Sequence, residues 1–242
     1  MPDGTGRGGE RLSGLQILAQ LRVSSSRDDI ARQLADYGAV RGYDASVRRL
    51  RQSTGDRVDL HLESQRLATV AWLRAWGCGH LRRTDTGRSA SVLGDWWNSW
   101  GRHLPAEHAT TAELGEADLS EAGQAYDALR LVPAAGRSLG DREVDVAFGP
   151  TAASKTMFAV RPQAFLPWDT RIRRAFTWSD GSDAYLSSLR LSAQTLAGLA
   201  RRLAVSVSDL PAVLDRPMSS PPKLIEEYLW MRITKARWAA DL

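Results

Sequence analysis

Apolar residues recur at helical spacing along most of the chain. Leu15, Leu18 and Leu21 lie on one face of an early segment, and Leu67, Val70 and Leu73 do the same further on. Glycine, proline and serine mark the segment ends, as at Gly77. This spacing predicts helices over 12–23, 28–37, 63–76, 89–100, 119–131, 151–160, 168–178, 183–203, 206–214 and 220–238.

Two segments do not follow this spacing. Residues 47–62 are ambiguous, because Val58, Leu60 and Leu62 alternate as they would in a strand. Residues 133–141 are rich in turn-forming residues and are predicted to be a connector. The pattern therefore predicts a mainly α, compact helical fold, with a candidate lobe boundary near 133–141. We expect a single domain over 11–242, after a frayed glycine-rich tail at 1–10.

The composition is that of an ordinary globular protein. Of 242 residues, 43% are apolar and 25% are charged, which excludes collagen-like, disordered and disulfide-scaffold chains. The single cysteine, Cys78, favours a cytoplasmic setting. The N-terminal tail lacks the apolar core of a signal peptide, and no apolar run approaches a bilayer-spanning length. We expect a monomer without a membrane partner.

The net charge of +4 is concentrated in one part of the chain. Between residues 150 and 178 the basic residues are Lys155, Arg161, Arg171, Arg173 and Arg174, and the only acid is Asp169. The remainder of the chain is neutral. A local positive field of this kind attracts anionic partners more than the overall isoelectric point suggests.

Lysine is rare in this chain, since only Lys155, Lys223 and Lys235 occur among 32 basic residues. A lysine in an arginine-rich chain suggests a position where a primary amine is needed, because arginine stays protonated and lysine can become a nucleophile. A surface position is the alternative for Lys155, and Lys223 and Lys235 are interpreted as ordinary solvated residues. Asp169 is either a helix cap or a carboxylate that orients water or stabilises a cationic transition state.

Lys155-Thr156, followed by Pro167-Trp168-Asp169-Thr170-Arg171-Ile172-Arg173-Arg174, resembles the catalytic stretch of the helix-hairpin-helix DNA glycosylases, in particular the 8-oxoguanine glycosylase branch. The resemblance is confined to residues 149–174. It implies that Lys155 attacks the anomeric carbon to form a Schiff base, and that Asp169 supports departure of the base. Where that family carries a Leu-Pro-Gly-Val-Gly hairpin before the lysine, this chain reads Gly-Pro-Thr-Ala-Ala-Ser.

A glycosylase extrudes its target base from the duplex, and this gives roles to the neighbouring residues. Arg171, Arg173 and Arg174 are candidates to hold phosphates, as are Thr151 and Ser154 near the start of the lysine-bearing helix; solvated or capping positions are the alternatives. Trp168 and Trp178 are candidates to stack on the base, with core packing as the alternative. The expected partner is double-stranded DNA, with no metal or organic cofactor. The expected target is a damaged base, such as an oxidised one, or a hypermodified base in foreign DNA.

Other functions are also compatible with parts of the sequence. Residues 195–214 resemble a helix-turn-helix, which suggests a non-enzymatic DNA-binding protein. A helical interaction module that only retains a glycosylase-like fold is a further possibility. A metal hydrolase is disfavoured, because the four histidines are scattered and none forms a metal-binding pair at helical spacing.

Overall fold

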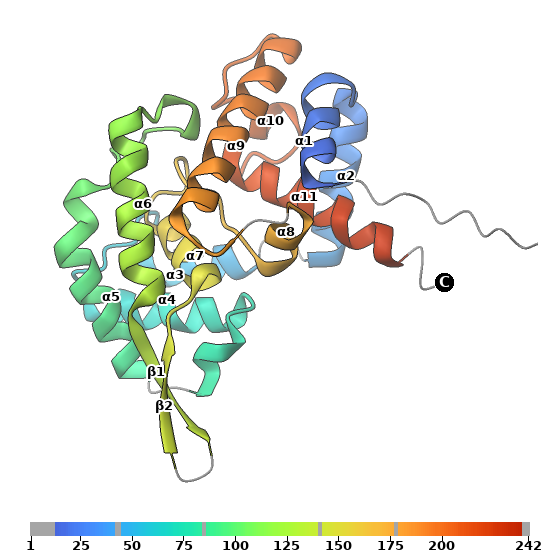
Figure 1. Cartoon of the computed structure of the whole chain (residues 1–242). Helices are drawn as coiled ribbons and strands as arrows, with labels where there is room; N and C mark the ends of the chain where they lie inside the picture. The colour runs from blue at the N-terminus through green and yellow to red at the C-terminus, as the bar shows by residue number, and fades with distance from the viewer. Residues whose placement is uncertain (1–12, 42–44, 84–85, 140–141, 177–178, 239–242) are drawn as a thin grey trace, which may run out of the picture.

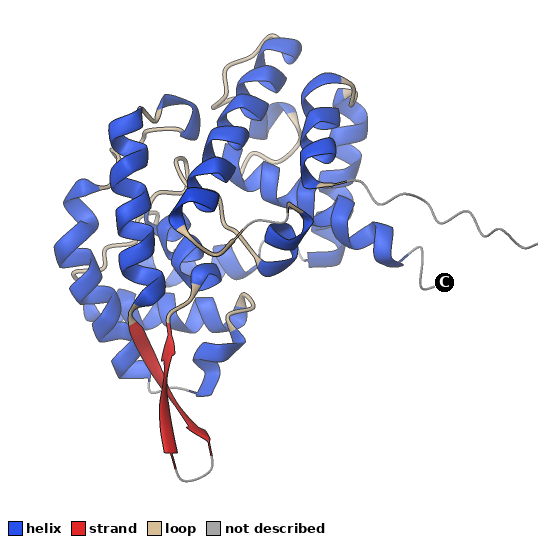
Figure 2. Cartoon of the chain, in the orientation of Figure 1, coloured by secondary structure: helices blue, strands red, loops and turns tan. Residues whose placement is uncertain are grey.

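The structure is a computed structural model, and it describes residues 13–41, 45–83, 86–139, 142–176 and 179–238. Over these ranges the fold is mainly helical, as predicted, with one β-hairpin (Figure 2). The tail at 1–10 lies outside the described residues. No helix within the described ranges has the length and apolar character to cross a membrane.

The larger helices, in chain order, are α1 (Gly14–Val23), α2 (Arg27–Arg41), α3 (Ala45–Thr54), α4 (Glu63–Ala75), α5 (Thr86–Trp100), α6 (Glu116–Leu131), α7 (Pro150–Val160), α8 (Thr170–Ala175), α9 (Ser182–Leu203), α10 (Leu210–Val213) and α11 (Pro221–Trp238). Three short 3-10 helices accompany them: η1 (Gly79–Arg83), η2 (Gly101–His103) and η3 (Thr111–Glu113). The strands are β1 (Pro133–Leu139) and β2 (Arg142–Ala147).

The predicted connector at 133–141 is in fact the first half of a β-hairpin. β1 pairs antiparallel with β2, with Pro133 opposite Ala147 and Leu139 opposite Arg142. The connector prediction was wrong because the pairing partner lies downstream, where Val144 and Val146 alternate with acidic residues. The hairpin joins α6 to α7 and projects from the helical body (Figure 1).

The ambiguous segment 47–62 divides into the helix α3 and a following loop. The segment 195–214 does not form a helix-turn-helix. Its first half is the end of α9, which stops at Ala204 in the left-handed conformation (φ 54°). Its second half contains only α10, one turn whose Leu210 and Pro211 are buried. A recognition helix needs exposed side chains over several turns, so this segment does not provide one.

One hydrophobic core runs through the helical body, with members from Ile17 in α1 to Leu229 in α11. Near its centre the rings of Tyr126 and Tyr185 stack with centroids 4.4 Å apart, and Trp168 lies 5.5 Å from Tyr185. Helices from the two ends of the chain lie side by side, because α11 packs on α1 and α2 (Figure 1). The first two helices and the last helix of the described chain therefore pack against one another.

Candidate functional site

A pocket of about 600 Å³ collects residues from five parts of the chain. They come from the loop after α4, from the end of β2 and the start of α7, from α8 and the residue before it, from the loop before α9, and from α11. The lining residues are Trp76, Gly77, His80, Ala147, Gly149, Pro150, Thr151, Lys155, Asp169, Thr170, Arg171, Arg173, Asp180 and Trp230. The pocket thus brings together five of the predicted site residues: Thr151, Lys155, Asp169, Arg171 and Arg173.

Lys155 lies on α7 with its side chain only 5% exposed. It follows Ala152, Ala153 and Ser154, all fully buried, whose small side chains let α7 pack deep in the body. Its Nζ donates a hydrogen bond to the Trp76 carbonyl and lies 4.3 Å from the centroid of the Trp76 ring. Lys155 is therefore a buried residue, and the surface alternative does not apply.

Burial is the main cause that lowers the pKa of Lys155 below its usual value of 10.5. The nearby positive charge of Lys223 acts in the same direction, whereas Cys78, Glu226 and Asp169 act against it. Burial also raises the pKa of the Cys78 thiol to about 11, so this thiol is neutral at pH 7. A lysine with a lowered pKa supplies more of the neutral amine that acts as a nucleophile.

The backbone beside this amine requires glycine. Gly77 has φ 92°, a left-handed conformation that favours glycine, and a Cβ at this position would be in ordinary contact with Lys155 Nζ at 3.7 Å. Gly149, which also lines the pocket, has a positive φ of 82°. His80 Nε2 lies 2.7 Å from the carbonyl oxygen of Phe148 and fixes the loop after α4 against the residues that precede α7.

Asp169 is both a helix cap and a pocket residue. Its Oδ1 accepts a hydrogen bond of 2.9 Å from the Ile172 backbone N–H at the start of α8. Within the described residues, Oδ2 has no hydrogen-bond partner. The capping interpretation is therefore correct, but it uses one oxygen only, and the half-buried carboxylate also lines the pocket with Lys155.

Ser154 does not face the pocket, although the sequence suggested a contact with DNA. It is fully buried, and its Oγ accepts a hydrogen bond from the Trp168 N–H (3.1 Å). The same hydroxyl group is within donating distance of the carbonyl oxygens of Trp168 (3.2 Å) and Thr151 (3.1 Å). Ser154 thus ties α7 to the residue that precedes Asp169, and so links the two candidate catalytic residues.

The predicted stacking role of Trp168 is corrected by its burial. The side chain is 0% exposed and packs against Tyr126 and Tyr185, so it belongs to the core and does not line the pocket. Trp178 lies outside the described residues. The tryptophans that do line the pocket are Trp76, which directly follows α4, and Trp230, which lies in α11. Neither was among the residues predicted from the sequence.

The basic segment at 150–178 exposes less charge than its sequence suggests. Arg161 is buried and donates to the Pro105 carbonyl oxygen at 2.7 Å. Arg173 is buried beside Trp168 and forms an ion pair of 3.1 Å with Asp180. Arg171 and Arg174 are exposed, but only Arg171 lines the pocket. Arg171 is therefore the best placed of the predicted phosphate ligands.

Sequence reasoning also misjudged Lys223, which it treated as a solvated residue. Lys223 is only 2% exposed and lies among the side chains of Tyr37, Glu226 and Glu227. One signal of the missed pocket wall was present in the sequence. The run Gly77-Cys78-Gly79-His80 was interpreted only as a helix end, although two glycines around a cysteine and before a histidine are also typical of a loop that approaches a ligand closely.

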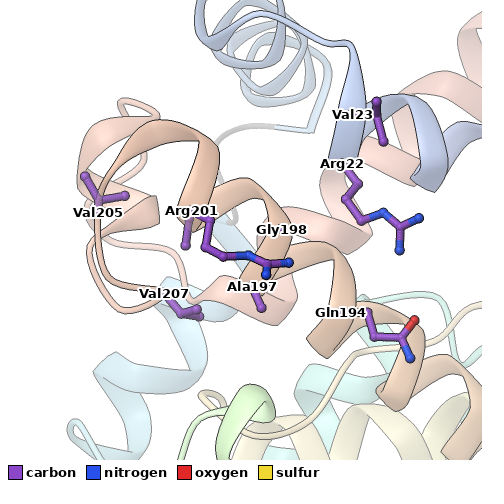
Figure 3. A pocket seen from close by; sticks show the side chains of 9 residues that line it. Arg22, Val23, Gln194, Ala197, Gly198, Arg201, Val205 and Val207 are labelled. Atoms are coloured by element: carbon purple, nitrogen blue, oxygen red, sulfur yellow. The ribbon is translucent and has the colours of Figure 1, made fainter.

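A second pocket, of about 890 Å³, lies between α1, α9 and the loop after α9. Figure 3 shows Arg22 from α1 and Arg201 from α9 beside the small residues Ala197 and Gly198. Its lining includes part of the segment 195–214, but none of the residues predicted for the glycosylase site. No group of three or more histidine, cysteine, aspartate or glutamate side chains suited to a metal ion occurs in the part of the chain that the structure describes.

Comparison with known proteins gives no match: no family model, curated protein or solved structure is significantly similar to this chain.

Proposed function

We propose that the protein is a DNA N-glycosylase of the helix-hairpin-helix type, which extrudes and excises a damaged or modified base. The observation that carries this proposal is the pocket that joins Lys155 to Asp169, the amine and carboxylate that the resemblance names. The loop before α7 departs from the family, since a β-hairpin stands in place of a short glycine-rich hairpin.

The proposed chemistry uses both side chains. The neutral amine of Lys155 attacks the sugar C1′, and the N-glycosidic bond breaks with its electron pair leaving on the base, which takes up a proton. Loss of a proton from the attacking nitrogen and opening of the sugar ring give a Schiff base, which water later hydrolyses. The Asp169 carboxylate stabilises the positive charge that develops on the sugar. The lowered pKa of Lys155 favours the first step.

The pocket walls suit an extruded nucleotide. Trp76 and Trp230 offer aromatic surface on which a base can stack. Thr151, at the N-terminus of α7, and Arg171 lie where a phosphate would be favoured by N–H groups and by charge. These positions support a nucleotide as the ligand.

The direct test is base release from a panel of duplexes that carry oxidised, alkylated and hypermodified bases, scored by mass spectrometry. We expect release from at least one duplex, and a loss of about 10²-fold or more in rate for Lys155→Gln and Asp169→Asn. Arg201→Gln, which removes an exposed charge at the second pocket, is the control and should retain the wild-type rate.

Two results would change this proposal. The absence of base release from every duplex would favour a DNA-binding module without catalytic activity. Base release that depends on Asp169, without a covalent adduct after borohydride treatment, would show that water is the nucleophile and that Lys155 has another role.

A further inference from the structure

A cluster of charged side chains is buried in the C-terminal part of the body. Lys223, Glu226 and Glu227 lie on α11, and Arg216 lies in the loop before it. Arg216 binds Glu227 through two contacts, of 2.7 Å and 3.1 Å. Lys223 donates hydrogen bonds to Glu226 and to the Tyr37 hydroxyl (2.9 Å), and its Nζ lies 3.7 Å from Glu227.

This cluster contacts the wall of the candidate active site through Trp76. The centroid of the Trp76 ring lies 4.3 Å from Lys155 Nζ and 5.2 Å from Lys223 Nζ. Lys223 Nζ also lies 4.7 Å from the centroid of Tyr37, which packs edge-on against Trp230 at 5.6 Å. Both pocket tryptophans are thus in contact with Lys223 or with its hydrogen-bond partner.

Packing alone does not explain the cluster. Removing charged groups from water costs several kcal/mol per ion, and well-packed apolar residues often stabilise a core as well or better. The charges of the cluster are nevertheless paired, and Lys155, which is also buried, lies close to it across the Trp76 ring. Its position therefore points to a role in the chemistry of Lys155.

We propose that Lys223 and Glu226 are positioning residues for Lys155: Lys223 holds Trp76 against its amine, Glu226 holds Lys223, and the two charges together tune the field around the amine. The role in catalysis rests on the proposed function, whereas the control of the amine does not. Lys223 opposes protonation of the neighbouring amine, and Glu226 acts in the opposite direction with the larger effect.

Other groups face Lys155 from each element packed around it. Cys78, after α4, and Asp169, before α8, raise its pKa, as Glu226 on α11 does. His80, Arg171, Arg173 and Asp180 line the same pocket. Loss of the Lys223 charge alone leaves Glu226 without its counter-charge, so the pKa of Lys155 should rise. Loss of the Glu226 charge alone should lower it, and loss of both charges should lower it by less than loss of Glu226 alone.

The scarcity of lysine makes this measurable in the intact protein. With ¹³C,¹⁵N-labelled lysine, NMR titration follows only three side-chain amines, and Lys155→Met and Lys235→Arg assign them. We expect the pKa of Lys155 to fall by up to about one unit in Glu226→Gln and to rise by a smaller amount in Lys223→Met. Lys223→Arg keeps the charge and should restore the wild-type value.

The double variant Lys223→Met/Glu226→Gln removes the pair together, and it keeps the test decisive if a single variant fails to fold. A downward shift in the double variant that is smaller than the shift in Glu226→Gln, or a rise in Lys223→Met, supports the proposal. An unchanged pKa of Lys155 in every folded variant overturns it, as does a fall in the double variant that equals or exceeds the fall in Glu226→Gln.

The titration needs no DNA, so its outcome is separate from that of the proposed function. If the pKa shifts occur but no duplex loses a base, the glycosylase proposal fails and the control of the amine stands. If bases are released, the pH profile of adduct formation should shift with the pKa of Lys155 in each variant. A merely structural role for Lys223 would lower activity without moving this profile.

Discussion

At the scale of single residues, the burial of Lys155 lowers the pKa of its amine and also costs folding stability whenever the amine is protonated. Its pKa is lower in the folded protein than in the unfolded chain, chiefly because of burial. The unfolded chain therefore binds more protons between these two pKa values, and stability rises with pH over that range. Below the folded pKa both states are protonated, and the folded state bears the full cost of a buried charge.

The first prediction follows from this cost. We expect Lys155→Met to increase the free energy of unfolding by about 1 kcal/mol at pH 7 while it abolishes activity. The gain should shrink as the pH rises through 10.5, the usual pKa of lysine, because above this pH the wild-type lysine becomes neutral in the unfolded chain as well. Urea unfolding at several pH values measures this. Arg201→Met, at an exposed position, should change stability by less than about 0.5 kcal/mol. Destabilisation by Lys155→Met at all pH values would contradict the argument.

Residue-level properties also show what the sequence could not predict. Lys155 and Asp169 were found because lysine is rare and because a local pattern surrounds them. Lys223 was misjudged because its burial depends on Tyr37, which lies far away in the chain on α2. Trp76 and Trp230 were missed for the same reason, because they are far apart in the sequence and only the folded chain brings them into one pocket.

At the scale of elements, the long helices were predicted well because each buries one periodic apolar face. The helix predicted over 183–203 corresponds to α9 (Ser182–Leu203), and the helix predicted over 63–76 corresponds to α4 (Glu63–Ala75). The β-hairpin was missed because neither strand is stable without the other. The second half of 195–214 was overestimated because Leu210 and Pro211 fill the core and do not extend a helix.

The second prediction concerns α8, a short helix that begins at the candidate catalytic carboxylate. Asparagine caps helices about as well as aspartate, whereas alanine does not. We expect Asp169→Asn to keep nearly wild-type stability, and Asp169→Ala to lose about 1 kcal/mol of unfolding free energy. Both variants should lose base release. Thermal unfolding and a base-release assay together separate capping from catalysis. Full activity in Asp169→Asn would show that the carboxylate serves only as a cap.

At the scale of the whole molecule, the charge on the surface differs from the charge counted along the sequence, because some of the basic side chains are buried. The basic segment that carries the excess charge buries Lys155, Arg161 and Arg173, so that Arg171 and Arg174 are its exposed cations. Buried cations with protein partners do not neutralise phosphates. The electrostatic contribution of this segment to DNA binding should therefore be smaller than its sequence suggests.

The third prediction tests this view of DNA binding. We expect Arg171→Gln to weaken binding of duplexes of any sequence and to reduce the slope of log K against log salt by about 1. Arg201→Gln, matched in charge at the second pocket, should leave the slope unchanged. Fluorescence anisotropy at several salt concentrations measures both. Equal slopes for the two variants would place the duplex elsewhere on the surface.

The closure of the body by its last helix has a consequence for how the protein is made. During synthesis, α7 with Lys155 leaves the ribosome well before α11 with Lys223, Glu226 and Trp230. Until α11 docks on α1 and α2, the pocket lacks one wall and the amine lacks two of its charged neighbours. A nascent chain would thus hold Lys155 in an incomplete pocket, and the surroundings of its amine would be completed only when α11 docks.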